Sequence, residues 1–552
     1  MKIIRRLCSN ASRNYFVTTP IYYVNAAPHI GHLYSSVIAD VIQRWHKLCH
    51  PGDNVVFSTG TDEHGMKIQQ AAANNKSTIN DYCKDISSKY MQLSDMFSVN
   101  YSHFIRTSDE KHKEAVHQFW NTINKNGHIY SSNYSGWYCI ADETFLASSQ
   151  LIDKLLSNGN KITVSAESGH PVEWSEEQNY MFRLSSFQDD LKYWLRSNEN
   201  SVNPKKFHRI LMELADSDAL TDVSISRPVS RVHWGIPVPD DPEHSVYVWM
   251  DALVNYLTAA GYPNEKFRKL WPPHLQVIGK DILKFHGIYW PAFLMAAGLE
   301  PPRTLFCHSH WTVDGQKMSK SKNNVVCPFD KMQTCTSDGL RYFLLREGVS
   351  HSDGNFSDVK LIRILNSELA DTLGNLLNRC SSVALNPNQT VPAFNSEAFT
   401  KLAKEDCAKI LLESIKSLPD IAKIHYSNYN FYKVVDAVNA TLHTANLFFE
   451  TMKPWELKKS PLTLEDLQAV LHVTIETLRV CGIILQPIIP NLCDALLNKI
   501  NVQRNVRSWE NILPLSWENP IKNKGKPLSE GKLVLFRRIL TENERKVKER
   551  MK

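Results

Sequence analysis

The stretch APHIGHLYSSVIADVIQRW (residues 27–45) places two histidines around one glycine, between a strand pattern and a helix pattern. Before it, YFVTTPIYYV (residues 15–24) is rich in β-branched and aromatic residues, which predicts a strand. From Leu33 to Trp45 apolar side chains recur at helical spacing, with no Pro or Gly before Pro51. Residues 25–32 therefore form a strand-to-helix turn, where open α/β sheets bind phosphates and nucleotides. Ordinary helix capping by the two histidines is the alternative.

Length and composition are typical of a soluble protein with several domains. The 552 residues are too many for one hydrophobic core and predict three or four domains. Hydrophobic residues make up 43% and charged residues 22%, as in globular proteins. No apolar run approaches the length of a membrane-spanning helix, so we expect no membrane partner. The net charge of +6 permits a polyanionic partner. The eleven cysteines include no CxxC pair, which is typical of a reducing compartment.

The first thirteen residues carry a separate signal. MKIIRRLCSNASR contains Arg and Ser, and no acidic residue occurs before Asp40. This pattern predicts a mitochondrial transit peptide, with a short basic tail as the alternative.

Along the chain, alternating strand and helix patterns are interrupted by a different segment, then return, and are followed by helical patterns alone. NVVFSTGTDEHG (residues 54–65) reads as a buried strand running into a turn, whereas residues 123–226 are rich in aromatics, turns and charges. The strand-then-helix pattern returns in SVYVWMDALVNYLTAAG and HLQVIGKDILKFHGIYW, and helical patterns dominate from residue 361. We predict a transit peptide (1–13), a nucleotide-binding domain (14–122 and 227–300) split by an inserted connective module (123–226), a loop region (301–360) and an α-helical domain (361–552).

A second motif is the lysine-rich loop GQKMSKSKNNVV (residues 315–326). Lys317, Lys320 and Lys322 lie in a Ser-containing segment without acidic residues. Most such clusters are solvated surface loops. A mobile loop with lysines and hydroxyls is also suited to stabilise charge that develops on a departing polyphosphate.

The two motifs together resemble the signatures of the class I aminoacyl-tRNA synthetases, HIGH (His29–His32) and KMSKS (Lys317–Ser321). Longer strings resemble the methionyl-tRNA synthetase family in particular, and the basic leader resembles its mitochondrial members. The resemblance implies a Rossmann-type parallel sheet interrupted by an inserted module and followed by an all-α anticodon-binding domain. It also implies that residues 301–360 form the KMSKS loop and a region that contacts the tRNA stem. The strings are YYVNAAPHIGHLYS, TGTDEHG, WGIPVP, YVWMDALVNYL, IGKDILKFH, LGNLLNR and KPW.

The resemblance also implies the reaction and the partners. Such enzymes activate methionine with ATP, bound as its Mg²⁺ complex, and transfer the aminoacyl group to tRNA(Met). Because no covalent enzyme intermediate is needed, the protein supplies positioning and charge stabilisation. For this chain we expect a monomer in the mitochondrial matrix.

The family's ATP-binding positions fall mainly in the two signatures. His29 and His32, at a helix N-terminus, can donate hydrogen bonds to phosphates, and Gly31 lets the nucleotide approach the backbone. Lys317 and Lys320 would contact the β- and γ-phosphates in the transition state. Together with His29 and His32 they are the predicted catalytic residues. The full set of predicted ATP-binding residues is His29, Gly31, His32, Gly279, Asp281, Lys317, Ser319, Lys320 and Ser321.

The family's methionine-binding positions are matched as well. Asp62 would pair with the ammonium group, and an apolar pocket with one polar side chain would receive the thioether. Ordinary packing in the core is the alternative for the aromatic residues. Leu253 stands where some members carry proline, so one pocket wall can differ. The predicted set is Ile21, Tyr23, Asp62, Trp249, Ala252, Tyr256, Ile282 and His286.

Two further features concern tRNA and zinc. Asn375, Arg379 and Trp455 match the positions that read the anticodon, by base-edge hydrogen bonds and stacking. Helix capping and a packed Trp are the alternatives. Some relatives carry a zinc knuckle in the inserted module, but Cys139 stands alone in WYCIADETF. A structural zinc needs about four Cys or His ligands, so we expect no structural zinc and no other resident metal.

Three other classes of protein share part of this pattern. Small nucleotidyltransferases use an HxGH turn, but they do not explain the helical half that contains Trp455. A non-catalytic tRNA-binding protein would require both signatures to be inert. A metallohydrolase would use histidines and one carboxylate as ligands, although HxxH at a helix start without a carboxylate motif is weak evidence. Its ligands would be His29, His32, Asp62, His64, His308 and His310.

Overall fold

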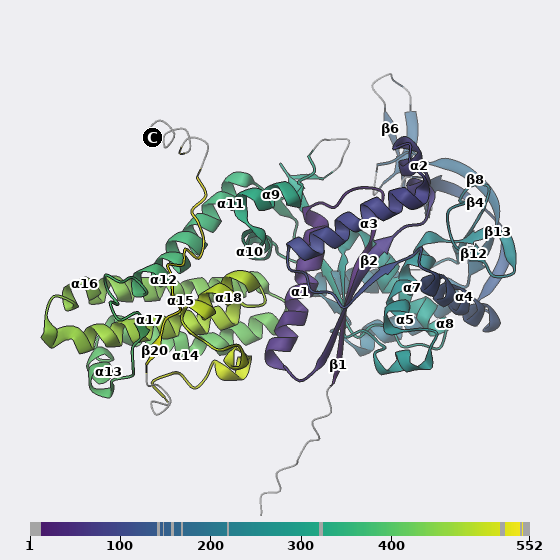
Figure 1. Ribbon diagram of the computed structural model, residues 1–552. Helices are drawn as coiled ribbons and strands as arrows, with labels where there is room; N and C mark the ends of the chain where they lie inside the picture. Colours follow the sequence, from purple (N-terminus) through teal and green to yellow (C-terminus); the bar gives the residue numbers. More distant parts are fainter. Residues whose placement is uncertain are drawn as a thin grey trace, which may run out of the picture. The chain divides into compact units, whose positions relative to one another are not determined.

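The computed structural model divides the chain into two compact units, each made of segments that alternate along the sequence (Figure 1). Unit 1 comprises Met1–Pro28, Asn54–Asp95 and Asn100–His308, and unit 2 comprises His29–Asp53, Met96–Val99 and Ser309–Lys552. The structure describes residues 13–140, 144–146, 148–155, 159, 161–166, 169–217, 220–318, 324–518, 525–540 and 544. The predicted transit peptide lies outside these residues, apart from Arg13.

Unit 1 is built on a six-stranded parallel sheet with the strand order β3-β2-β1-β14-β15-β9. The first two strands match the sequence patterns closely, since β1 covers Asn14–Tyr23 and β2 covers Asn54–Asp62. They pair from Asn14↔Asn54 to Tyr23↔Asp62. The other strands are β3 (His103–Arg106), β14 (Leu275–Gly279), β15 (Leu305–His308) and β9 (Val202–Asn203).

The helices of unit 1 connect these strands and bury its core. Strand β2 is followed by α2 and α3, and α7 precedes β14 in the chain. The largest apolar cluster includes Phe119, Trp290 and Phe293, which come from α4 and α8. The helices are α2 (Met66–Asn74), α3 (Ile79–Met96), α4 (Glu110–Lys125), α5 (Gln188–Ser197), α6 (Lys205–Asp216), α7 (Val248–Ala260) and α8 (Trp290–Ala296).

Smaller antiparallel sheets occupy the chain between β3 and β14. One has the order β10-β8-β4-β5 and another the order β11-β13-β12, and β6 and β7 form a hairpin. The edge strand β9 of the main sheet also comes from this stretch, from residues that the sequence pattern assigns to the insert. The strands are β4 (Ile129–Cys139), β5 (Thr144–Leu146), β6 (Leu151–Leu155), β7 (Lys161–Ser165), β8 (Glu173–Phe182), β10 (Val223–Ser224), β11 (Ser226–Pro228), β12 (Pro237–Val238) and β13 (Asp241–Val246).

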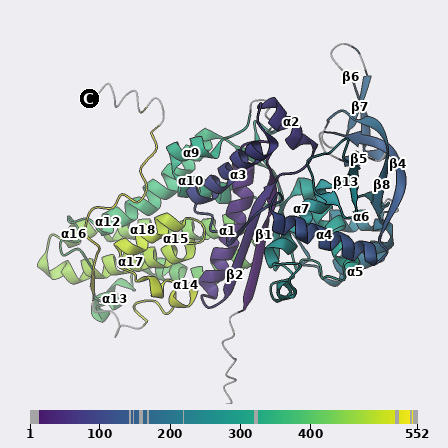
Figure 2. The ribbon, with the colours of Figure 1, turned by 45° about the vertical axis from the view of Figure 1, so that its right-hand side comes forward.

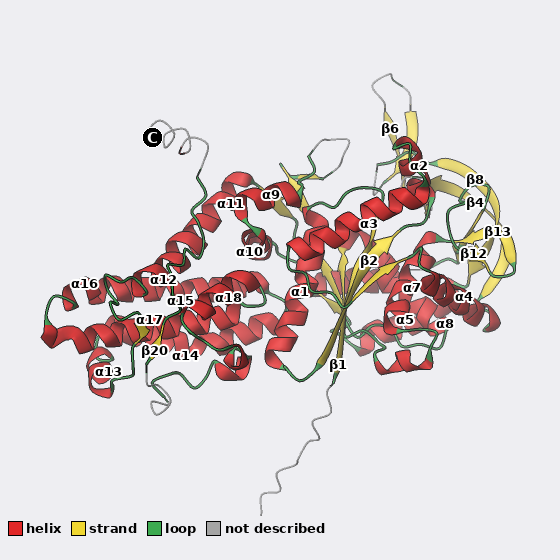
Figure 3. Ribbon diagram, viewed as in Figure 1, coloured by secondary structure: helices red, strands yellow, loops and turns green. Residues whose placement is uncertain are grey.

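Unit 2 is mostly helical, and Figure 3 shows helices dominating the chain from α9 onward. It begins with α1 (Ile30–Cys49), the helix predicted after the two histidines. A small sheet follows, with β16 (Trp311–Val313) between β17 (Gln316–Lys317) and β18 (Gly354–Phe356). The helices are α9 (Pro328–Cys335), α10 (Ser337–Glu347), α11 (Asp358–Ile364), the π-helical η7 (Leu365–Gly374), α12 (Asn375–Cys380), α13 (Ser396–Leu402), α14 (Asp406–Ser427), α15 (Phe431–Met452), α16 (Pro454–Leu457), α17 (Leu464–Leu485) and α18 (Pro490–Lys499).

An apolar helix, α17, is buried within this helical region. Helix α15 packs against α14 and α17, and the three run side by side in Figure 2. The segment Pro461–Leu485 is long and apolar enough to cross a membrane, so the expectation that no apolar run reaches this length was wrong. The most apolar 18 residues of this segment are 89% buried within the protein, as in the core helix of a bundle.

Candidate active site

Four of the predicted methionine and adenosine residues of unit 1 lie at one edge of its main sheet. Tyr23 at the end of β1 pairs with Asp62 at the end of β2, and Gly279 at the end of β14 pairs with His308. Because the strands are parallel, their carboxyl ends lie at the same edge, which is the ligand-binding edge of open α/β sheets. Asp281 follows β14 in the 3₁₀ turn Lys280–Ile282 and is exposed.

The turn after β2 is held tightly on both sides of its backbone. Glu63 is fully buried and accepts two hydrogen bonds from the Arg106 guanidinium, at 2.7 and 2.9 Å. The indole N–H of Trp234 donates to the Glu63 carbonyl at 2.6 Å, and the amide of Gly65 donates to the Trp234 carbonyl at 2.9 Å. Asp62, which precedes Glu63 and is nearly buried, therefore sits on a fixed backbone.

An aromatic cluster brings together four of the residues predicted to bind the thioether. The rings of Trp249 and Phe285 stack with their centroids 3.7 Å apart. The Tyr256 hydroxyl lies 2.7 Å from Nε2 of His286, and Nδ1 of His286 lies 3.0 Å from the Ile282 carbonyl oxygen. The sequence analysis missed Phe285, although it directly precedes His286 in IGKDILKFH.

The hydrogen bonds of His286 define its protonation. Burial lowers the pKa of His286 to about 4, so the ring is neutral at working pH. A carbonyl only accepts, so the proton resides on Nδ1, and Nε2 accepts from the Tyr256 hydroxyl. Ala252 lies one turn before Tyr256 on α7. The cluster is thus an apolar site with one polar pair, which is suited to a thioether.

In unit 2, the two histidines of the first motif cap helix α1 reciprocally. Nδ1 of His29 accepts from the amide of Gly31 at 3.0 Å, and Nδ1 of His32 accepts from the amide of His29 at 3.1 Å. The two histidines therefore do cap the helix, as the alternative interpretation predicts. Because both Nδ1 atoms act as acceptors, the neutral rings carry their protons on Nε2. Capping and donation to an anion thus use different nitrogens of the same rings.

The glycine between the histidines also has a steric role. A Cβ at Gly31 would lie 2.8 Å from Cε1 of the His29 ring, closer than real Cβ atoms approach. The same position would lie 3.8 Å from Cε of Met318. The amide of Ile30 donates to the Val326 carbonyl at 3.1 Å. The start of α1 therefore contacts both flanks of the lysine-rich loop.

Only part of that loop belongs to the described residues. Lys317 is exposed at the end of β17, and its carbonyl accepts from the Asn324 side chain at 3.2 Å. Ser319, Lys320 and Ser321 lie outside the described residues.

The predicted anticodon residues lie on the helical part of unit 2. The Arg379 guanidinium is 5.7 Å from the centroid of the Trp455 ring and 4.7 Å from that of Phe449, and it pairs with Glu450 at 2.8 Å. Asn375 is exposed one turn earlier on α12. Trp455 is 38% exposed, which argues against a role as a buried core residue.

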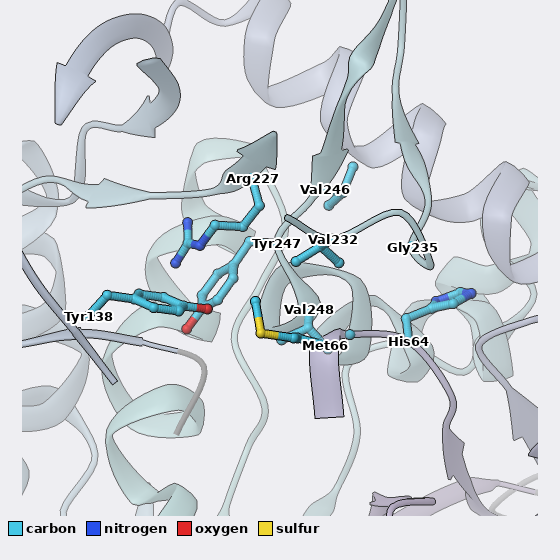
Figure 4. Close-up of a pocket in the computed structure, with 10 residues that line it drawn as sticks. His64, Met66, Tyr138, Arg227, Val232, Gly235, Val246, Tyr247 and Val248 are labelled. Atoms are coloured by element: carbon cyan, nitrogen blue, oxygen red, sulfur yellow. The ribbon is translucent and has the colours of Figure 1, made fainter. Parts of the chain in front are cut away.

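A small pocket lies beside the turn after β2 in unit 1 (Figure 4). Its lining includes Tyr138, Arg227 and Tyr247, none of which the sequence analysis selected. Arg227 is buried, with its guanidinium 4.5 Å from the centroid of Tyr247, and Nη1 donates to Ser224 Oγ at 2.8 Å. Its Nε is buried and finds no acceptor among the described residues. The sequence carries no signal for this residue beyond two arginines, Arg227 and Arg231, before WGIPVP.

The ligand set of the metallohydrolase alternative does not assemble. Among the described residues, no three His, Cys, Asp or Glu side chains form a group that could hold a metal ion. The six residues of that alternative include His29 and His32, whose Nδ1 atoms already serve as helix caps.

Comparisons with known proteins agree over nearly the whole chain. The family model of the class I (M) tRNA synthetases matches residues 15–381. The mitochondrial methionine–tRNA ligase of Homo sapiens is 45% identical over 541 residues, which cover 96% of this chain and 91% of that protein. The methionine–tRNA ligase of Rickettsia bellii is 39% identical, with coverage of 91% and 95%.

A solved structure matches the fold as well. Methionyl-tRNA synthetase of Mycobacterium tuberculosis in complex with methionyl-adenylate superposes with a TM-score of 0.87 at 36% identity, covering 95% of this chain and 99% of that one. This match confirms the predicted fold class, an interrupted parallel sheet followed by a helical region.

Proposed function

Because the chain belongs to the class I (M) tRNA synthetases, we propose that it is a methionine–tRNA ligase that serves mitochondrial translation. In the first step a carboxylate oxygen of methionine attacks the α-phosphorus of ATP, the bond to the β-phosphate breaks, and pyrophosphate leaves. In the second step a ribose hydroxyl of the terminal adenosine of tRNA(Met) attacks the carbonyl carbon of methionyl-adenylate, and AMP leaves. ATP enters as its Mg²⁺ complex, so the metal belongs to the substrate.

The single observation that carries this proposal is the reciprocal capping of His29 and His32. It fixes both rings with Nε2 as the N–H donor at the positive end of a helix dipole. Donors fixed in advance stabilise the charge that builds on the phosphates without reorganising during the reaction. Lys317 and Lys320, with Ser319 and Ser321, are assigned to the same phosphates by their match to the KMSKS motif.

The methionine roles follow from unit 1. We assign Asp62 to the substrate ammonium, and Ile21, Tyr23 and Ala252 to the walls of the pocket. Trp249, Tyr256, Ile282 and His286 supply the thioether site, because they form the apolar cluster with the Tyr256–His286 pair. Gly279 and Asp281 are assigned to the adenosine moiety at the same sheet edge.

The tRNA roles belong to unit 2. Asn375, Arg379 and Trp455 are assigned to the anticodon, since an exposed Trp beside a guanidinium offers a stacking surface and base-edge donors. We further propose that the protein acts in the mitochondrial matrix as a monomer and carries no structural zinc. The basic, acid-free leader and the mitochondrial relatives support the compartment.

One assay tests the proposal against its competitors. The protein should catalyse methionine-dependent exchange of pyrophosphate into ATP without tRNA, and should charge tRNA(Met) when it is added. Exchange that does not depend on methionine would indicate a different nucleotidyltransferase. Binding of tRNA without exchange would indicate a non-catalytic tRNA-binding protein.

A further inference from the structure

A buried carboxylate outside the predicted site lies between two histidines in unit 1. Asp251 on α7 is fully buried. Its Oδ2 is 2.6 Å from Nδ1 of His64, and its Oδ1 is 2.7 Å from Nε2 of His112. Nδ1 of His112 lies 2.9 Å from the Thr258 hydroxyl on the same helix as Asp251. Each carboxylate oxygen thus holds one imidazole.

These bonds join three segments that are far apart in the sequence. His64 belongs to the turn after β2 and stands two residues after Asp62. His112 lies in the first turns of α4. Asp251 lies on α7 between Trp249 and Tyr256, which belong to the aromatic cluster. One carboxylate therefore sets the distance between the ammonium side and the thioether side of the proposed methionine pocket.

The charge of Asp251 is compatible with this role. Burial by itself would raise the pKa of Asp251, but the interactions with His64 and His112 outweigh burial and hold the pKa below its usual value. The group is therefore ionised at working pH and accepts on both oxygens. An Asn side chain has nearly the same shape but only one accepting oxygen, so it can hold only one of the two histidines in the present way.

We propose that Asp251 is a positioning residue for methionine recognition, because it fixes the turn that carries Asp62 against the helix that carries Trp249 and Tyr256. This inference rests on the proposed function. Asp251 acts through His64 and through the backbone of α7. A shift of about 1 Å between binding groups can reduce the efficiency of a reaction about 100-fold.

The test compares Asp251→Asn with a matched change in unit 2. Asp338 is also a buried carboxylate and accepts from the Leu492 amide at 2.7 Å, but it belongs to no proposed binding site. In tRNA-independent pyrophosphate exchange, Asp251→Asn should raise the KM for methionine about 10- to 100-fold and leave the KM for ATP within about twofold. Asp338→Asn should leave both KM values within about twofold, even if its melting temperature falls.

The outcomes separate positioning from simple stabilisation. If Asp251→Asn lowers the melting temperature and the active fraction but leaves the KM for methionine unchanged, Asp251 is only a stabilising residue and the inference is overturned. A rise in both KM values also overturns it. Should Asp251→Asn fail to fold, His112→Gln is the second variant. It weakens the bond between Asp251 and α4 and should raise the KM for methionine alone. The wild-type protein is assayed first, so that failure of the proposed function is seen separately.

Discussion

At the scale of single residues, hydrogen bonds decide which nitrogen of each histidine carries the proton. The Ile282 carbonyl assigns the proton of His286 to Nδ1, whereas the caps of α1 assign the protons of His29 and His32 to Nε2. His286 consequently accepts from Tyr256, while the other two present donors. One residue type thus serves two different chemical tasks.

The neutral His286 predicts a measurable sensitivity to acid. An unfolded histidine titrates near pH 6.5, whereas burial lowers the pKa of folded His286 to about 4, so the unfolded state binds more protons between these values. The contribution of neutral His286 to the free energy of unfolding is therefore complete above pH 6.5 and is lost as the pH falls toward 4. Between pH 7 and pH 5 the free energy of unfolding, measured with urea, should fall by about 2 kcal/mol more in the wild type than in His286→Gln. Equal losses would place the acid sensitivity elsewhere.

Sequence reasoning found the right residue types at this scale but not their contacts. Matching to family motifs selected Trp249, Tyr256 and His286, and the structure brings them into contact. It could not select Phe285 or Arg227, because an aromatic stack and a buried cation depend on partners distant in the sequence. The steric role of Gly31 is also invisible without the His29 ring position.

At the scale of elements, the start of α1 makes a sharp prediction. In Gly31→Ala the new methyl group displaces the His29 ring and breaks its cap, while alanine itself favours a helix by about 1 kcal/mol. Loss of a cap costs about 0.5–2 kcal/mol, so overall stability should change little. Methionine-dependent exchange should nevertheless fall at least about tenfold, because a phosphate donor is misplaced.

Gly52→Ala is the matched control for this change. A Cβ at Gly52 meets no atom within 4 Å, so this variant should retain wild-type exchange. If Gly31→Ala also keeps full activity, the position of the His29 ring does not matter for catalysis.

Further along α1, a buried ion pair connects it to other helices of unit 2. Arg341 on α10 is fully buried and lies 2.7 Å from Oδ2 of Asp40. It also donates to the carbonyls of Phe97, Pro487 and Ile488. Asp40→Asn removes the carboxylate that pairs directly with this buried guanidinium and should destabilise the protein by about 3–5 kcal/mol in urea unfolding.

A double variant checks the assignment of that loss. If the pair is the cause, Asp40→Asn should cost much less in a protein that already carries Arg341→Met, because no buried charge is left uncompensated. Fully additive losses would mean that the two side chains act independently.

The sequence predicted long elements well and short or irregular ones poorly. Strands β1 and β2 lie within a few residues of their predicted bounds, because their patterns extend over nine or ten residues. Strand β9 has two residues and gives no periodic signal. The π-helical segments Phe285–Tyr289 and Leu365–Gly374 widen a turn that the helical period alone describes as ordinary α-helix.

At the scale of the whole molecule, Trp455 tests whether charging and activation can be separated. In Trp455→Ala the KM for tRNA should rise about 10- to 100-fold, since stacking on an unpaired base contributes about 1–3 kcal/mol. Methionyl-adenylate formation needs no tRNA, so exchange should stay within about twofold. Both reactions and a melting curve are measured on the same preparation.

Leu462→Ala provides the control, because Leu462 is 94% exposed and lies a few residues away. This variant should leave charging and exchange unchanged. If Trp455→Ala reduces both reactions equally and lowers the melting temperature, the substitution acts on folding. Trp455 is then not an anticodon-binding residue.

At this scale the sequence predicted the order of the α/β and helical parts, and the solved relative confirms that architecture. It did not predict that the compact units would interleave along the chain. Apolar periodicity reports which face of an element is buried, but it does not identify the partner element. Helix α1 follows β1 directly in the sequence and yet belongs to unit 2.

This interleaving has a consequence for how the polypeptide is made. A ribosome finishes α1 early, but Arg341 emerges about 300 residues later, and Asp40 has no ion-pair partner on α10 until then. Closing so long a loop is slow and entropically costly, and it leaves the apolar face of α1 open in the meantime. A nascent chain released at the end of unit 1's last segment, His308, would carry α1 without α10. We expect such a fragment to be a substrate for chaperones and proteases. The ion pair with Arg341 is only the first of these late contacts, because Trp45 on α1 also packs against Tyr426 and Trp509, which are made later still.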